Sequence, residues 1–418
     1  MKYRPLICLA LIHTLVDGYA QLVTPLWPRL KDDLRLDAWM LTALLGSWQL
    51  ATSVSQPLFG YLGDRFSGRW MVAVGPALAI VCLTMIGFAP GAASLTVLLV
   101  AGGLGIGAFH PEAAVGVVDA AGVKATRGLA LFTFAGLVGL GLGPVVSGLL
   151  TEHLGLHSLA WTMMPGLLLL GVLVFCRGPA GHPHRASEDA SDGPPGILNG
   201  RGLSVLLLLA VATLRVVPAL GVPLGLAFLL KQQGRSEAVI GLTQSLFLLS
   251  GGLGTLACPF FAHPGRELRA LIATTLLASG FLILLTQPQP WAFYTGLVGS
   301  GFLLQGAIPL LIAYSQRLLP RGRRLAASLS LGASWGLGGI LVAALQAYSA
   351  SVGKLETMMW AMVPFAVSAS LAAAFLPRLA AVRSPLVLDH VTAPVLSTAI
   401  TGSDLATAFT RAPACNEP

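Results

Sequence analysis

"GIGAFHPEAAVGVVDAAGVKATRGLALFTFAGLVGLG", residues 105–141, runs from an apolar stretch through a basic turn into a glycine-rich apolar stretch. The second half of the chain repeats this order in "LLQGAIPLLIAYSQRLLPRGRRLAASLSLGASWGLGG", residues 303–339. Pro111 aligns with Pro309, and the basic turns and glycine-rich stretches align with each other. The repeat indicates that the two halves of the chain share one fold.

The composition places the chain in a membrane. Hydrophobic residues make up 55% of its 418 residues and charged residues only 10%, against about 25% charged residues in soluble domains. The first apolar stretch begins at Leu6, carries Asp17 and is followed by no small-residue cleavage site, so we expect a retained span. The five cysteines show no CxxC and no metal-ligand spacing, and we expect no disulfide, metal or cofactor.

The apolar stretches predict an all-α membrane protein with twelve transmembrane helices in two six-helix lobes, since a helix needs about 20 residues to cross the hydrocarbon. We expect an N-terminal lobe at 1–177, a cytoplasmic linker at 178–202, a C-terminal lobe at 203–376 and a disordered cytoplasmic tail at 377–418. A six-span repeat predicts a two-lobed transporter with its site between the lobes near mid-membrane. The expected spans are 6–28, 40–62, 71–89, 95–119, 127–151, 159–177, 203–230, 238–261, 268–286, 291–316, 325–349 and 357–376.

The distribution of basic residues predicts the orientation. The segments on the side of the N-terminus hold 18 Lys and Arg residues and those on the other side hold 6, so both termini are expected in the cytoplasm. The net charge of +8 is spread over short clusters between spans, which argues against a nucleic-acid partner. Six tryptophans are expected in aromatic belts at the membrane interfaces, namely Trp27, Trp39, Trp70, Trp161, Trp291 and Trp360.

Two motifs are interpreted as conformational devices. In "GYLGDRFSGRW" (60–70), Gly60 permits close helix contact, while Asp64, Arg65 and Arg69 are expected to form a cytoplasmic latch that stabilises the outward-facing state. In "GLVGLGLGPVVSG" (136–148), small residues at one-turn spacing let helices approach closely, and a proline bends the span. The residues of this second motif are Gly139, Gly143, Pro144 and Gly148.

Ionisable residues inside the apolar stretches are the candidate site. His13, Asp17 and Gln21 share one helix face at i, i+4 steps, and Asp17 falls near the bilayer centre. The seventh span, which corresponds to the first in the repeat, carries Arg215 near its middle. An ionised group there costs several kcal/mol unless it is paired or hydrated, so Arg215 is expected to bind substrate or to pair with a buried acid.

"FHPEA" (109–113) adds a second ionisable pair, in the fourth span. His110 and Glu112 are two residues apart and therefore face different sides of the helix. Histidine titrates near neutral pH and a desolvated glutamate can do so, so both are candidates for proton coupling together with Asp17. The alternatives are a static ion pair that fixes lobe packing and a hydrogen-bonded packing histidine.

With these residues, the chain resembles the major facilitator superfamily from residue 1 to about 380, and more narrowly its fosmidomycin-resistance efflux transporters. The resemblance is carried by "HTLVDGYAQLVTPLWPRLKDDL" (13–34), "QPLFGYLGDR" (56–65), "FHPEA" and the arginine of "TLRVVPALG". The fifth-span glycines resemble a motif of exporters and antiporters in that superfamily. The resemblance implies proton-driven export of small polar or anionic compounds across the inner (plasma) membrane of a bacterium, by a monomer.

The preferred hypothesis is therefore a proton-coupled exporter of small, anionic or drug-like molecules that works by alternating access. An importer or uniporter on the same fold is the nearest alternative, because helices do not encode direction. A multi-span membrane enzyme would need a catalytic cluster, and the sequence has no HxxxxD and no GxSxG. A sensor would need a folded soluble module, for which the linker and tail are too short.

Overall fold

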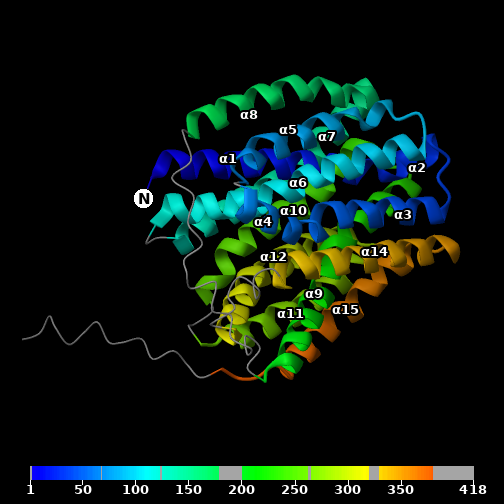
Figure 1. Ribbon diagram of the computed structural model, residues 1–418. Helices are drawn as coiled ribbons and strands as arrows, with labels where there is room; N and C mark the ends of the chain where they lie inside the picture. The colour runs from blue at the N-terminus through cyan, green and yellow to red at the C-terminus, as the bar shows by residue number, and fades with distance from the viewer. Residues whose placement is uncertain are drawn as a thin grey trace, which may run out of the picture. The chain divides into compact units, whose positions relative to one another are not determined.

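The computed structural model describes residues 2–66, 68–122, 125–177, 200–261, 265–319 and 329–379, and all regular elements in these segments are helical (Figure 1). The first half contains α1 (Tyr3–Ala20), η1 (Thr24–Leu26), α2 (Trp27–Asp33), α3 (Ala38–Gln49), η2 (Leu50–Val54), α4 (Gln56–Phe66), η3 (Gly68–Trp70), α5 (Met71–Thr84), η4 (Met85–Phe88), α6 (Ala92–Ala121), α7 (Ala125–Leu154), η6 (Leu156–Thr162) and α8 (Met163–Arg177). The second half contains α9 (Gly202–Gln232), α10 (Glu237–Phe261), α11 (Glu267–Leu285), α12 (Pro290–Leu318), η8 (Leu329–Ala333), α14 (Ser334–Ser351) and α15 (Glu356–Ala374).

Eleven helical stretches in the described part of the chain are long and apolar enough to cross a membrane. They match eleven of the twelve expected spans. The remaining expected span, 40–62, is divided by the π-helical turn η2 into α3 and α4, so neither piece reaches membrane length by itself. The expected tail lies outside the described residues from residue 380 onward, as does most of the linker, residues 178–199.

Glycine seams bring the helices of the first half together. The close packing of α7 on α1 requires glycine at two positions. A side chain on Gly139 would collide with Thr14, and one on Gly143 would collide with Gln21. The same helix then reaches the second half, where Gly148 lies against the backbone of Glu237 in α10. Small residues at one-turn spacing allow this close approach. The fifth-span motif therefore packs α7 against one helix of each half.

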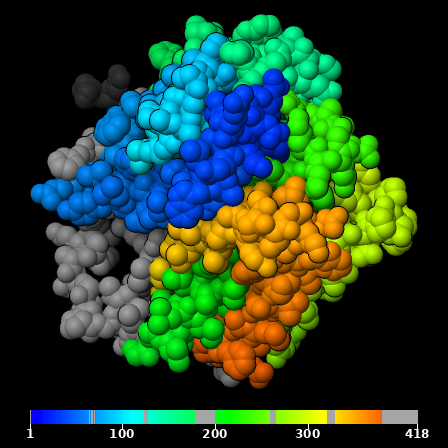
Figure 2. Space-filling model, turned by 90° about the vertical axis from the view of Figure 1, so that its right-hand side faces the viewer, coloured from blue at the N-terminus to red at the C-terminus, as the bar shows by residue number. Residues whose placement is uncertain are grey.

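The most extensive contacts between the two halves lie along two helix pairs, α7 with α10 and α3 with α14 (Figure 1). At the face opposite the N-terminus, Arg29 Nη1 lies 3.1 Å from Glu237 Oε2, and the side chain of Glu237 is only 10% exposed. Beside this pair, the Ala238 amide donates to Glu152 Oε2 at 2.8 Å. Figure 2 shows this face, where the blue atoms of the first half meet green and orange atoms of the second. The two halves are thus tied together at this face.

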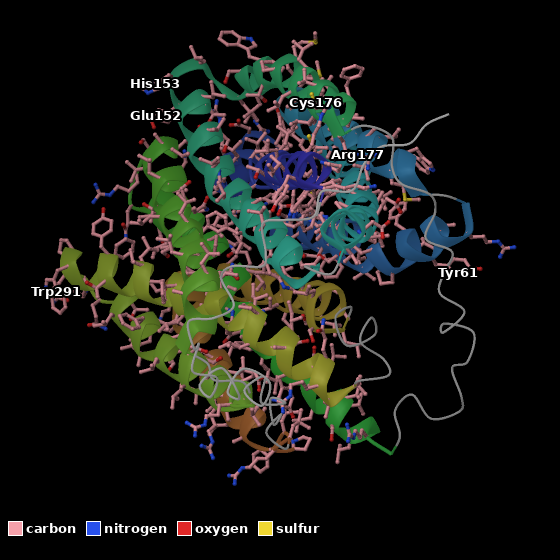
Figure 3. The ribbon with its side chains drawn as sticks, turned by 90° about the vertical axis from the view of Figure 1, so that its left-hand side faces the viewer. Tyr61, Glu152, His153, Cys176, Arg177 and Trp291 are labelled. Atoms are coloured by element: carbon pink, nitrogen blue, oxygen red, sulfur yellow. The ribbon has the colours of Figure 1, made fainter. Side chains whose placement is uncertain are left out.

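Most of the tryptophans expected in aromatic belts are exposed, and one is buried. Trp39, Trp161 and Trp291 are 66–79% exposed, and Trp291 projects outward from the first turn of α12 (Figure 3). Trp27, however, is 2% exposed and packs inside the helix bundle. Its expected place in an aromatic belt was therefore wrong, because a ring enclosed by the bundle does not contact the lipid head groups.

Candidate functional site

A cavity of about 70 Å³ lies between the two halves of the chain. It has room for a few water molecules, since one needs roughly 10–15 Å³. Every lining residue in the described part of the chain is uncharged. Its polar wall combines four amide or hydroxyl side chains with three indole rings: Gln21, Thr24, Gln49, Gln305, Trp27, Trp48 and Trp335. Such a lining offers hydrogen bonds and flat apolar surfaces to a small polar molecule.

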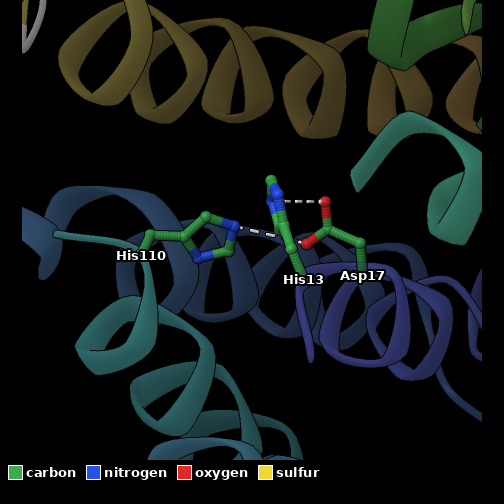
Figure 4. A group of neighbouring side chains, drawn as sticks. All are labelled: His13, Asp17 and His110. Atoms are coloured by element: carbon green, nitrogen blue, oxygen red, sulfur yellow. Dashed lines mark ion pairs between the residues drawn. The ribbon is translucent and has the colours of Figure 1, made fainter. Parts of the chain in front are cut away.

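A cluster of two histidines and one aspartate, in which His13 and Asp17 are buried and His110 is partly buried, lies one helical turn from this cavity. Asp17 precedes the cavity residue Gln21 by four positions, and the backbone N–H of Gln21 donates to the backbone carbonyl of Asp17. His13 Nε2 lies 3.1 Å from Asp17 Oδ2, and His110 Nε2 lies 3.3 Å from Asp17 Oδ1. Figure 4 shows His13 and Asp17 on α1 and His110 reaching them from α6. Each carboxylate oxygen thus meets one imidazole.

The other ring nitrogens fix how this cluster can hold protons. His13 Nδ1 lies 2.7 Å from the Phe132 carbonyl, and His110 Nδ1 lies 2.8 Å from the Ile106 carbonyl. A carbonyl only accepts hydrogen bonds, so each Nδ1 carries a proton and each Nε2 is the atom that gains or loses one. Each Nε2–carboxylate contact therefore needs one shared proton to become a hydrogen bond. The cluster can therefore hold a shared proton in neither, one or both of its Nε2–carboxylate contacts.

The surrounding side chains hold this cluster tightly. The His13 ring stacks on Phe132 with a centroid distance of 3.9 Å and an interplanar angle of 21°. On the facing helix α7, a Cβ on Gly136 would lie 2.6 Å from His13 Nε2 and 2.7 Å from Asp17 Oδ2. Only glycine leaves room for both groups, which makes Gly136 a site residue that the sequence pattern alone did not single out. The three ligand atoms lie within 4.8 Å of one another, a spacing at which such groups could hold a metal ion.

Arg215 does not join this cluster, so the expected pairing of Arg215 with a buried acid is not seen at Asp17. Arg215 is 0% exposed in the middle of α9, and its Nη1 donates to the Leu304 carbonyl of α12 at 2.8 Å. The seventh span therefore carries a buried cation whose described hydrogen-bond partner is a neutral backbone group.

Glu112 also lies apart from the cluster. A Cβ on Gly68 would lie 2.6 Å from Glu112 Oε2, so the carboxylate contacts the loop between α4 and α5. Gly60 of α4, at the start of the expected latch, lies against Pro111 of α6, the helix that carries Glu112. The expected difference in facing between His110 and Glu112 is thus seen: His110 meets Asp17, and Glu112 meets the loop.

The latch residues are only partly described. Arg65 is exposed, and its Nη1 donates to the hydroxyl of Tyr61, which projects from α4 (Figure 3). The side chains of Asp64 and Arg69 lie outside the described part of the structure.

Sequence reasoning missed the polar contacts that join the two halves. Arg29, Glu152 and Glu237 stand at helix ends, where charged residues are common, and no periodicity connects them. Figure 3 shows Glu152 at the end of α7 beside the first turn of α10. A possible signal was that the basic Arg29 and the acidic Glu237 flank spans on the same predicted side of the membrane.

Two halves of membrane-length helices around a central cavity, with ionisable groups buried beside it, define a polytopic membrane carrier. The sequence profile described as Major Facilitator Superfamily matches residues 9–261. The chain belongs to this superfamily of membrane transporters.

Individual relatives agree with this assignment. The chain is 26% identical to the fosmidomycin resistance protein of Escherichia coli (strain K12) over 346 residues, which cover 81% of this chain and 84% of the relative. Among solved structures, it is similar to the nucleoside transporter NupG, with a TM-score of 0.65, 14% identity and coverage of 90% of this chain and 98% of NupG. A bacterial homolog of the human lysosomal transporter Spinster gives a TM-score of 0.64 at 15% identity, with coverage of 89% and 96%.

Proposed function

We propose that this protein is a proton-coupled exporter of small polar or drug-like molecules, which works as a monomer in the inner (plasma) membrane with both termini in the cytoplasm. The observation that carries the proposal is the convergence of His13 and His110 on Asp17, one turn from the cavity. A carboxylate at mid-span is costly unless its charge is matched, and an imidazole matches it only while both ring nitrogens carry protons.

Alternating access would couple the cluster to the cavity through α1. Asp17 and the cavity residue Gln21 are successive positions on one face of this helix, so a change in the proton content of the cluster bears on the cavity wall. The Arg29–Glu237 pair and the Glu152–Ala238 contact would close the pathway at the predicted outer face. Opening that face requires both to break. Glu112, beside the α4–α5 loop, would act on the cytoplasmic latch and not on the proton.

Export is preferred over import for two reasons. The Gly139–Gly148 motif resembles that of exporters, and the relative from Escherichia coli is named for resistance to fosmidomycin. A susceptibility panel of an overexpressing strain, with fosmidomycin as the first compound and several anionic metabolites beside it, identifies a cargo. Hypersensitivity and intracellular accumulation would indicate import and overturn the preference for export.

The proton role is tested in inverted vesicles with an acidic interior, in which the cargo should dissipate the pH gradient. Asp17→Asn removes the charge and one acceptor of the cluster, and we expect it to abolish this dissipation while the protein remains folded. The matched control is Asp32→Asn, since Asp32 is an exposed carboxylate on the same segment of the chain. Unchanged coupling in Asp17→Asn would remove the proton role. Protection of the gradient by Zn²⁺ would show that a metal ion competes for the cluster.

A further inference from the structure

Arg215 has one complete hydrogen-bonding edge that no described residue occupies. Its Nη1 is used by the Leu304 carbonyl, whereas Nε and Nη2 are buried and have no partner among the described residues. Nε and Nη2 lie on the same edge of the planar guanidinium. Their two parallel N–H groups are the pair that binds both oxygens of a carboxylate or phosphonate side by side.

The charge of Arg215 is also unmatched by any described residue. Within the described segments, no carboxylate lies within 4 Å of this guanidinium, because Asp17 is paired with histidines and Glu112 contacts Gly68. A fully buried cation without a counter-charge is strongly unfavourable, and such a residue inside a membrane span is ordinarily part of a binding site. The unused Nε–Nη2 edge and the positive charge of Arg215 therefore require the same kind of partner, an oxyanion.

Arg215 does not line the cavity itself, but residues next to it in the fold do. Ala219 lines the cavity and is one helical turn beyond Arg215 on α9. Gln305 also lines it and directly follows Leu304, the residue that accepts from Arg215. Two polar atoms of this wall, Gln305 Oε1 and Trp335 Nε1, are themselves buried without a partner. Unused polar groups of the second half thus occur both in the cavity wall and on Arg215.

We propose that the second half carries an oxyanion subsite, in which the Nε–Nη2 edge of Arg215 binds a carboxylate, phosphonate or phosphate group in bidentate fashion. The uncharged remainder of the molecule occupies the cavity between Trp335, Trp48 and the glutamines. This inference rests on the proposed transport function and narrows its cargo to molecules with one anionic head group and a polar body.

The test measures binding to the full-length protein purified in detergent, without a membrane or a pH gradient. Thermal unfolding is followed with increasing methylphosphonate, acetate, inorganic phosphate or chloride at constant ionic strength. We expect saturable stabilisation by the oxyanions and a much weaker effect of chloride. Equal stabilisation by chloride, or none by any oxyanion, would overturn the subsite. Tighter binding of phenylphosphonate than of inorganic phosphate assigns the oxyanion to a cargo head group, and equal binding assigns it to a free anion.

Two substitutions make the test specific to the edge. Arg215→Lys keeps the charge but loses the planar fork, so affinity for methylphosphonate should fall about tenfold or more. The matched control is Arg201→Gln, because Arg201 also donates to a carbonyl of α12, that of Leu318, but is exposed and precedes the first turn of α9, far from Ala219. An Arg215→Lys variant with wild-type affinity refutes the proposal. If this variant does not fold, the anion panel on the wild-type protein still decides.

The outcome is separable from that of the proposed function. A protein that binds oxyanions through Arg215 but ignores the pH gradient would fail the proton proposal and keep the subsite. A protein that couples transport to protons but binds no oxyanion would keep the exporter and lose the subsite.

Discussion

Gly136→Ala is expected to uncouple transport from the proton gradient without removing any ionisable group. The added Cβ would lie 2.6 Å from His13 Nε2 and 2.7 Å from Asp17 Oδ2. Ordinary carbon contacts are about 3.5–4.0 Å, so each group would have to retreat by roughly 0.8 Å or more. His13 cannot retreat freely, because its ring stacks on Phe132 and its Nδ1 is held by the Phe132 carbonyl.

The magnitude follows from the contact that gives way. A hydrogen bond to a charged group contributes about 1.5–3 kcal/mol, and overpacking a dense site costs about 1–3 kcal/mol. Since about 1.4 kcal/mol is a factor of ten, loss of the His13–Asp17 contact should lower gradient-driven transport about 10- to 100-fold. The assay is dissipation of an imposed pH gradient in inverted vesicles, with fosmidomycin as the first cargo.

The control for this experiment is Gly171→Ala. Gly171 lies in α8, and an added Cβ there has no heavy atom within 4 Å, so both folding and transport should stay at wild-type levels. A folded Gly136→Ala protein that transports with wild-type dependence on the gradient would refute the cluster as the proton site.

Three further predictions concern other parts of the molecule. A double-mutant cycle of Arg29→Gln and Glu237→Gln should give a coupling energy of about 1–2 kcal/mol in thermal unfolding, since the pair is partly screened by solvent; additive effects would mean that the pair does not join the halves. Gly143→Val should lower the unfolding temperature by several degrees, because its side chain would meet α1. A Cβ on Gly280 would have no described atom within 4 Å, so Gly280→Val should leave the unfolding temperature unchanged. Equal shifts in the two variants would contradict the close packing of α7 on α1. Glu112→Gln should leave the dependence of transport on the pH gradient unchanged, because Asp17 provides the cluster carboxylate. A loss in vesicles as large as that of Asp17→Asn would instead place Glu112 on the proton path.

The polarity pattern of the sequence predicted the helices well. Eleven expected spans coincide with described helices because the free energy of placing a segment in hydrocarbon depends on its own length and composition. The span expected at 40–62 was divided by a π turn, which hydropathy does not register, since such a turn changes hydrogen bonding and not polarity. The orientation from basic residues stays a prediction, as does the latch role of Asp64 and Arg69.

Within one helix, the sequence also determined which groups meet. His13 and Asp17 were expected on one face from their spacing, and they form an ion pair, because the α-helix fixes the i, i+4 relation. The opposite facing of His110 and Glu112 followed from the same geometry. These inferences needed no partner helix.

Only the tertiary structure decided which helix faces meet. It brought His110 of α6 to Asp17, left Arg215 beside a backbone carbonyl, and turned Glu112 to a loop. The physical reason is that the rotation and separation of two helices depend on how small residues of one fit the backbone of another, as Gly136 fits against α1. Helical period is written in each segment, whereas that fit is a property of the pair.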